Sequence, residues 1–167
     1  MVLKDFDKNL EKYAKLLIST GINVQPGHTV NIVIDVDQAP LARLLVKEAY
    51  AHGASEVIVS WADDFVGRER LLHAAEDRIT NVPEYRVAEM NYLLEKKASR
   101  LNVRSADPDA FAGVSAERLQ QSTKALSLAL KPLRTATQAN KVSWTVASAA
   151  GKEWAKKVFP NAATDEE

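Results

Sequence analysis

One early run of β-branched residues, TVNIVIDV at positions 29–36, restricts the possible folds more than any other segment of the chain. Val and Ile fill it so completely that both faces of a strand formed here must be covered, as in the centre of a parallel sheet. Residues 40–53 follow with a proline in the first turn, leucines on one side and a glycine stop, which predicts a helix. Residues 55–61 predict a second strand, and the three segments form a right-handed β-α-β unit.

Helical and strand-like patterns alternate along the rest of the chain. Helical spacing of apolar residues predicts further helices at residues 6–21, 66–79, 85–94 and 117–138. Pro83 joins two of these helices, and Pro132 should kink or end the last one. Asp107 and Pro108 fit the cap and first position of another helix, and residues 100–104 predict a short strand.

The last strand and helix signals fall in residues 142–160, which hold two of the three tryptophans. Val142, Trp144 and Val146 alternate with polar residues, which predicts a half-buried strand whose apolar face is covered by the helices of the sheet. Helical spacing begins at Lys152 and ends at Pro160. Large aromatic residues at periodic positions usually pack in a core, so Trp144 and Trp154 are both predicted to be core residues.

Four strands that alternate with helices predict an α/β fold, with a doubly wound, mostly parallel sheet of about four strands and helices on both faces. The length of 167 residues suits one domain, so we expect a single α/β domain at residues 1–160. Residues 161–167 are expected to begin a linker or a disordered tail.

The composition disfavours several classes of protein. The 22 basic and 22 acidic residues cancel, so nothing attracts the chain generally to nucleic acid or to an anionic membrane. There is no cysteine, which excludes disulfides, thiolate nucleophiles and cysteine-ligated metals. The chain has neither a signal-peptide pattern nor a run of apolar residues long enough to span a bilayer, so we expect a cytoplasmic protein without a membrane anchor.

Carboxylates follow three of the predicted strands, where ligands bind in such sheets. They are Asp35, Asp37, Asp63, Asp64, Asp107 and Asp109. They are compatible with a site for a cation or an ammonium group, but aspartate is also a preferred helix cap, and we favour capping. A dinucleotide site is disfavoured because DQAP, at positions 37–40, occupies the place of a glycine-rich phosphate loop.

The remaining polar residues form no recognisable catalytic pattern. The three histidines, His28, His52 and His73, are widely separated, which is poor spacing for metal ligands, and we expect all three on the surface. No nucleophile elbow or Ser/His/Asp set can be identified. The sequence therefore assigns no catalytic residue and no metal ligand to this chain.

Three stretches together resemble a known family. They are YAKLLISTGINVQPGHTVNIVI at 13–34, AYAHGASEVIVSW at 49–61 and SWTVASAAGKEWAKKVFP at 143–160. In this order they resemble the amino-terminal half of the thermophilic-type metalloaminopeptidases, the family of aminopeptidases T and S (PepS). The pair NVQPG and WAKKVFP is the most specific part. Where the family usually has a proline and often a threonine before WA, this chain reads SAAGKE.

The resemblance implies that this α/β domain is the amino-terminal, non-catalytic part of a longer enzyme. It implies a missing carboxyl-terminal catalytic domain, in which Glu, His and Asp residues hold two divalent metal ions, zinc, cobalt or manganese. The parent enzyme would remove amino-terminal residues from peptides as a homodimer, whereas the isolated chain would be inactive. Two alternatives remain, a free-standing α/β module that binds a small ligand and a dimerisation domain.

The helix after residue 151 has a particular place in this hypothesis. Trp154, Val158 and Phe159 are predicted to contact the missing domain. In a chain without that domain, the helix should be the least protected regular element, since few apolar contacts would oppose its opening.

Overall fold

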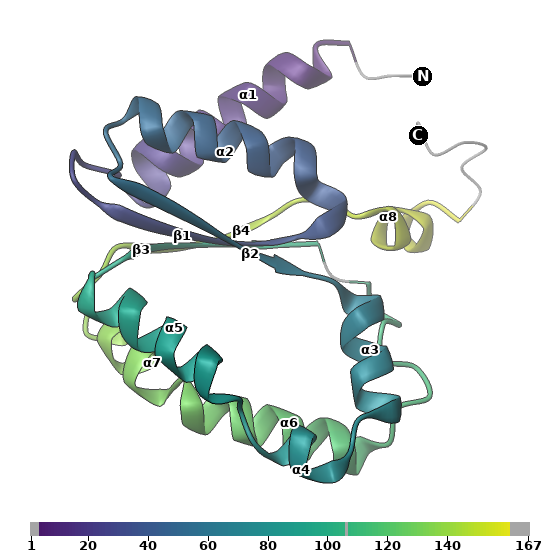
Figure 1. Cartoon of the computed structure of the whole chain (residues 1–167). Helices are drawn as coiled ribbons and strands as arrows, with labels where there is room; N and C mark the ends of the chain where they lie inside the picture. Colours follow the sequence, from purple (N-terminus) through teal and green to yellow (C-terminus); the bar gives the residue numbers. More distant parts are fainter. Residues whose placement is uncertain (1–3, 106, 161–167) are drawn as a thin grey trace. The chain divides into compact units, whose positions relative to one another are not determined.

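The structure, a computed structural model, describes residues 4–105 and 107–160. The chain divides into two compact units, which are treated separately (Figure 1). Unit 1 comprises Met1–Ala62, Ser99–Pro108 and Trp144–Glu167, and unit 2 comprises Asp63–Ala98 and Asp109–Ser143. The prediction of one domain at residues 1–160 stays a prediction, and the predicted tail at 161–167 lies outside the described residues.

Unit 1 contains a parallel sheet of four strands. The strands are β1 Thr29–Asp35, β2 Glu56–Ala62, β3 Ser99–Arg104 and β4 Trp144–Ser148. Their order is β2-β1-β3-β4, and every neighbouring pair is parallel. The chain moves from β1 to β2 on one side and then returns to β3 on the other, which is the strand order of a doubly wound sheet. The predicted fold class, the number of strands and the central position of β1 are confirmed.

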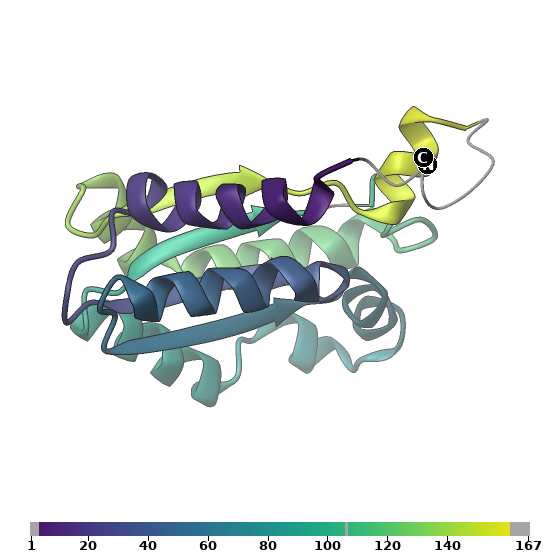
Figure 2. The ribbon, with the colours of Figure 1, turned by 90° about the horizontal axis from the view of Figure 1, so that it is seen from above.

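Two helices cover one face of this sheet. Helix α1 Phe6–Leu16 continues into a π-helical turn at Leu17–Gly21, and α2 Ala39–Ala51 connects β1 to β2. Figure 2 shows α1 and α2 side by side along the strands. Their apolar stripes form one core with the sheet, in which the fully buried members include Ile18, Ile22, Ile32, Ile34, Leu45 and Leu101.

The edge strand β4 is hydrogen-bonded to the first helical segment. The Thr145 hydroxyl donates to the carbonyl oxygen of Gly21 at 2.6 Å, at the end of the π-helical turn. The Tyr13 hydroxyl donates to the carbonyl oxygen of Ser148 at 2.9 Å. Among the described residues β4 pairs with β3 alone, so these two hydrogen bonds add a second attachment, on the face of the sheet that α1 covers.

The prediction that Trp144 and Trp154 are core residues is wrong. Their exposed fractions are 46% and 48%, and Val146 is 58% exposed. Thr145 and Ala147 point toward the α1 side, and side chains alternate along a strand, so Trp144 and Val146 point to the opposite face. The period of two identifies a strand but does not show which face is covered. The expected cover over Trp144 and Val146 is therefore also wrong.

The described residues of unit 2 form helices and turns. The helices are α3 Asp64–His73, α4 Glu76–Thr80, α5 Glu84–Glu95, α6 Ala116–Ala129 and α7 Lys131–Gln138. Residues 66–94 thus form three helices rather than the two predicted, because Ala74 and Ala75 take extended backbone conformations that end α3. Pro132 lies in the first turn of α7, as expected for a proline that ends or kinks the preceding helix.

The helix predicted to begin at Asp107 and Pro108 is also wrong. Turns occupy residues 108–113, and the next helix begins only at Ala116. The Ser115 side chain caps it by accepting a hydrogen bond from the Arg118 backbone N–H at 3.3 Å. Gly113 has a φ of 85°, which favours glycine and does not occur in a right-handed helix.

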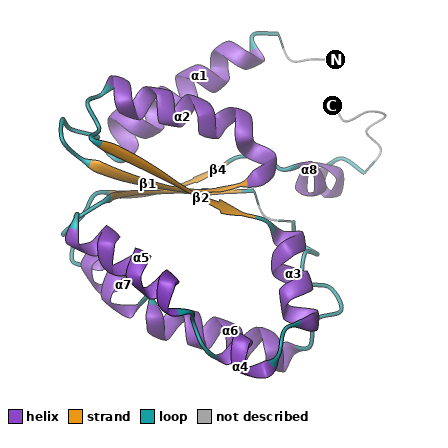
Figure 3. Cartoon of the chain, in the orientation of Figure 1, coloured by secondary structure: helices purple, strands orange, loops and turns teal. Residues whose placement is uncertain are grey.

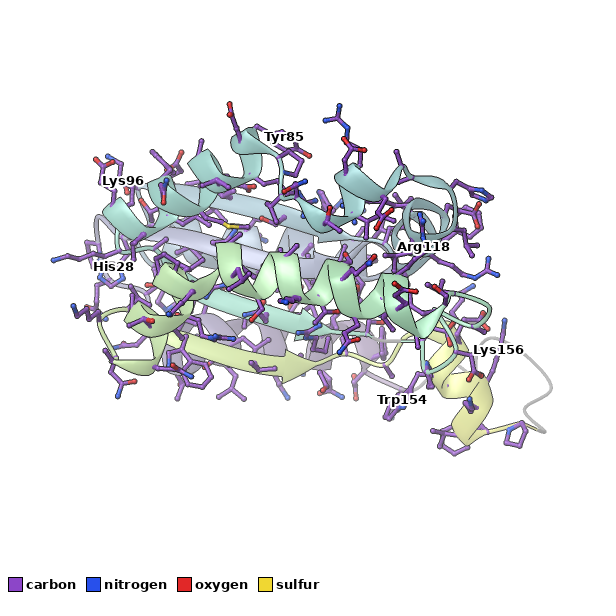
Figure 4. All side chains as sticks on the ribbon, turned by 90° about the horizontal axis from the view of Figure 1, so that it is seen from below. His28, Tyr85, Lys96, Arg118, Trp154 and Lys156 are labelled. Atoms are coloured by element: carbon purple, nitrogen blue, oxygen red, sulfur yellow. The ribbon has the colours of Figure 1, made fainter. Side chains whose placement is uncertain are left out.

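Arg118 ties α6 to the end of α3. Its Nε donates to the carbonyl oxygen of Leu71 at 2.6 Å, and its Nη2 donates to the carbonyl oxygen of Ala74. The last carbonyl groups of a helix have no partner within it, so a guanidinium with several fixed donors suits this position. Arg118 is labelled in Figure 4.

Thr145→Val should lower the free energy of unfolding by about 1 to 2 kcal/mol, because the Gly21 carbonyl loses its donor while the β-branched shape remains. Thr145→Ser keeps the hydroxyl and serves as the matched control. Urea titrations of the two variants measure the difference. An equal loss in both variants would assign the effect to packing and not to the hydrogen bond.

Arg118→Ala should cost about 1.5 to 3 kcal/mol, since two carbonyl groups lose a charged donor. Arg118→Lys keeps the charge, but a single ammonium group lacks the planar set of donors with which the guanidinium binds both carbonyl groups. Lysine should therefore recover only part of the lost stability. Denaturant titration with helical circular dichroism tests this. Full recovery by lysine would show that charge alone accounts for the role of Arg118.

Candidate functional site

In doubly wound sheets, ligands usually bind at the carboxyl ends of the strands where the strand order reverses. In unit 1 that point lies between the ends of β1 and β3, which are neighbours in the sheet. The segments that meet there are the short 3-10 turn Val36–Gln38 after β1, Ser105 after β3, and residues 149–151 after β4.

A connected set of hydrogen bonds joins these three segments, and we call it the strand-end network. The Ser105 backbone N–H donates to Oδ2 of Asp35 at 2.7 Å. The Ser105 hydroxyl donates to Oδ2 of Asp37 at 3.2 Å. Nε2 of Gln38 donates to the Ser105 hydroxyl at 3.3 Å and to the carbonyl oxygen of Ala150 at 3.1 Å. Each segment is therefore bonded to at least one other.

Gly151 fills the space at the centre of the network. It is buried, and a Cβ atom at this position would lie 2.4 Å from the Ser105 hydroxyl oxygen and 2.9 Å from Oδ2 of Asp37. It would also lie 2.9 Å from the Ser105 carbonyl oxygen. Only glycine allows this approach without a shift of its neighbours. The usual ligand position of the fold is thus occupied by the chain's own turn.

The structure separates the predicted acidic residues into different roles. Asp63 caps α3 by accepting a hydrogen bond from the Val66 N–H at 3.1 Å, so the capping interpretation is confirmed there. Asp35 and Asp37 instead bind Ser105. Asp64 lies in the first turn of α3, and Asp107 and Asp109 lie outside the helices. The capping interpretation is therefore wrong for Asp107 and Asp109, which begin no helix, and for Asp35, whose side chain makes no cap hydrogen bond, while Asp37 and Asp64 do lie in first helical turns.

Gln38 and Ser105 were not identified from the sequence. Both are common residue types, and they lie far apart in the chain, so no local pattern relates them. The one available signal was the glycine at position 151, within the unusual SAAGKE stretch. Its contacts become apparent only when the three strand ends are placed side by side.

The described residues do not fit the metal pair that the resemblance implies. Within residues 4–105 and 107–160, no group of three or more His, Asp or Glu side chains is placed to hold a metal ion. No step of a metal-assisted reaction can therefore be assigned to them. The same part of the chain also has no helix that combines the length and the apolar character needed to cross a membrane.

The histidines have structural partners of different kinds. Nδ1 of His28 accepts a hydrogen bond from the Gln25 N–H at 3.3 Å and lies 3.2 Å from the Ser99 hydroxyl oxygen. His28 and His52 are both partly buried, so the prediction of a surface position is confirmed only for His73. His52 lies 3.4 Å from Glu48 one helical turn away, and His73 is exposed.

The face of the sheet opposite α1 and α2 carries polar residues near its centre. Asn31 is only 2% exposed, and its Nδ2 donates to the Ser60 hydroxyl at 3.0 Å. Arg100 lies beside Asn31 in the register of β1 and β3. Burial lowers the pKa of the Arg100 guanidinium. These residues distinguish the two faces of the sheet, a difference that the Val- and Ile-rich sequence of β1 did not indicate.

The short helix α8 Lys152–Val158 follows β4 and the turn at residues 149–151 (Figure 3). None of its residues is buried. Trp154 and Val158 lie one turn apart on the same side, Phe159 ends the helix, and their exposed fractions are 48%, 51% and 58%. We call these three residues the α8 surface. Figure 4 shows Trp154 and Lys156 on this helix, where Lys156 pairs with Glu153 at 2.8 Å.

Comparisons with known proteins identify a family and several relatives of this chain. Residues 6–167 match a family model described as thermophilic metalloprotease (M29). The chain is 70% identical to aminopeptidase PepS of Streptococcus thermophilus over all of its 167 residues, and 35% identical to aminopeptidase AmpS of Bacillus subtilis over 98% of them. The solved structure of wild-type AmpT from Thermus thermophilus is 33% identical, covers 97% of this chain and superposes with a TM-score of 0.88.

These relatives are much longer than the chain. It spans 40% of the length of PepS and of AmpS, and 41% of the AmpT structure. The family match covers almost all of the 167 residues, and the shared fold is the α/β sheet described above. The chain therefore belongs to the thermophilic metalloprotease (M29) family, in which it corresponds to an amino-terminal domain of the aminopeptidase T and S type.

Proposed function

We propose that this chain is the amino-terminal domain of a metal-dependent aminopeptidase that removes amino-terminal residues from peptides. The observation that carries the proposal is the match of residues 6–167 to a metalloprotease family whose relatives here are all named aminopeptidases. The named relatives are more than twice as long as the matched part, which supports placing the chemistry in a carboxyl-terminal catalytic domain. The present domain supports that one and walls its cleft.

The α8 surface is the proposed contact with the catalytic domain. A helix of seven residues is too short to be stable in water without packing, and α8 has no buried residue here. Trp154 and Phe159 are residue types that often carry the binding energy of an interface. The relatives extend well beyond the length matched by this chain. Their additional residues are the proposed partner of the α8 surface.

The remaining properties of the parent enzyme follow from the family. Two divalent ions, zinc, cobalt or manganese, would supply a Lewis acid and an activated water in the catalytic domain. We propose that the parent is a cytoplasmic homodimer that acts on peptides. Zero formal charge gives this chain no general attraction to nucleic acid or to membrane surfaces, and neither is a proposed partner.

The strand-end network argues against a free-standing module that binds a small ligand at the strand ends. In such a module, the reversal point between β1 and β3 would have to be open to the ligand. Gly151 occupies that point instead, in close contact with Ser105 and Asp37. A dimerisation domain remains the second candidate, because an exposed α8 surface would also suit a second copy of the chain.

When zinc, cobalt or manganese is added, the 167-residue chain should not release amino acids from short peptides at an enzymatic rate, which is about 1 per second or more. The longer enzyme under the same conditions is the positive control. The reason is that the described residues bring no metal-ligand group together. Metal-dependent turnover at an enzymatic rate by the chain alone would place the chemistry in this domain and overturn the proposal.

In the 167-residue chain, amides of residues 152–158 should exchange with solvent faster than those of β1, because α8 has no buried residue. In the longer enzyme, the same amides should gain protection when the α8 surface is covered. Hydrogen exchange followed by mass spectrometry compares the two proteins. Equal exchange of α8 in both proteins would mean that the catalytic domain packs elsewhere. If protection of α8 in the 167-residue chain rises with protein concentration, the dimerisation domain is favoured instead.

Trp154→Ala and Trp144→Ala form a matched pair, since the two side chains are almost equally exposed in the chain. In the 167-residue chain, both should cost much less than the roughly 3 to 5 kcal/mol of a buried tryptophan. In the longer enzyme, only Trp154→Ala should cost about 2 kcal/mol more, as an interface residue does. Denaturant titration of all four proteins measures this. Equal costs for the two tryptophans in the longer enzyme contradict an interdomain role for Trp154.

A further inference from the structure

The direction in which α8 leaves the sheet depends on a very short connection. The last ladder hydrogen bond of β4 runs from the Ala149 N–H to the carbonyl oxygen of Arg104 at 2.9 Å. The Gly151 carbonyl oxygen already accepts the first helical bond, from the Ala155 N–H at 2.9 Å. Only the peptide groups around Ala150 separate the sheet ladder from the helix, so their orientation sets the direction of α8.

The strand-end network holds this connection from two sides. Gln38 donates from Nε2 to the Ala150 carbonyl oxygen and to the Ser105 hydroxyl, which uses both amide hydrogens. Ser105 and Asp37 pack against the Cα atom of Gly151. The connection is therefore fixed by β1 and β3 rather than by packing of α8 itself, none of whose residues is buried.

We propose that Asp37, Gln38 and Ser105 are positioning residues that orient α8, and with it the α8 surface, before the catalytic domain docks. A helix held in its bound direction loses less conformational freedom on docking than one that moves freely on a loop. The identity of the docking partner rests on the proposed function. The orientation of α8 by the network does not, because it is a property of unit 1.

The role of Gln38 can be isolated by a substitution that keeps its length. Gln38→Met removes both amide hydrogens and leaves a flexible side chain of similar size. Gln25→Met is the matched control, because the Gln25 side chain is exposed and bonds only to nearby Asn23. Ser105→Ala is a second test variant, since it removes the hydroxyl bonds to Asp37 and Gln38 but keeps the backbone bond to Asp35.

Nuclear magnetic relaxation of backbone amides in the 167-residue chain tests the proposal directly. Backbone order parameters are about 0.85 in rigid segments and below about 0.6 in flexible ones, and we expect those of the α8 amides to be lower in Gln38→Met and Ser105→Ala than in the original chain. The amides of β1 and β3 should keep their values in all variants, and Gln25→Met should change neither. Unchanged order in α8 would overturn the proposal. A simultaneous fall of the order parameters in β1 and β3 would also overturn it, because the network would then stabilise the whole sheet and not the direction of α8 in particular.

A second measurement separates this inference from the proposed function. In the longer enzyme, Gln38→Met should lower the exchange protection of α8 amides about tenfold, the effect of roughly 1.4 kcal/mol, while Gln25→Met leaves it unchanged. If α8 gains no protection in the original longer enzyme, but Gln38→Met still loosens it in the short chain, the proposed docking fails and the positioning role stands. If α8 is protected in the longer enzyme and Gln38→Met has no effect in either protein, the positioning role fails and the docking stands.

Discussion

The burial of β1 on both faces is the constraint on which the rest of the structure depends. Val30, Ile32 and Ile34 are completely buried against α1 and α2, while Thr29 and Asn31 are buried on the opposite face. Each fully buried aliphatic side chain contributes about 1.5 to 3 kcal/mol, so displacement of this strand would be very costly. Since β1 is central, its pairing with β2 and β3 also determines which residues meet at the strand ends.

This constraint explains which parts of the fold could be predicted from the sequence. The four strands and their alternation with helices follow from local patterns, because a buried strand and an amphipathic helix differ in the spacing of apolar residues. The exposure of Trp144 could not be predicted in the same way. An edge strand shows the same alternation whether or not its second face is covered, and nothing in residues 142–146 reveals what lies beside them. The break at Ala74 and Ala75 was missed because alanine favours helices and gives no stop signal.

The strand-end network could not be predicted because it depends on tertiary structure alone. Asp35 and Asp37 were noticed as carboxylates after a strand, yet aspartate suits a helix cap and a cation site equally well. Their actual partner, Ser105, is brought to them by the pairing of β1 with β3. Gly151 stands between the strand pattern and the helix pattern, where a glycine is unremarkable. Its lack of a Cβ atom, which lets the turn enter the space between Asp37 and Ser105, is visible only in three dimensions.

The use of the reversal point for structure rather than for a ligand is consistent with the proposal that the chemistry belongs to another domain. In an open doubly wound sheet, the ends of the two strands at this point diverge and leave a crevice with free backbone groups and side chains, which is why ligands bind there. In this chain, Asp35, Asp37 and Gln38 are hydrogen-bonded to other parts of the same unit, so a ligand would have to break those bonds to enter. Closing the crevice gives α8 a defined starting direction and leaves its apolar side chains exposed. A domain that must present a surface to a partner gains more from this arrangement than one that must bind a small molecule.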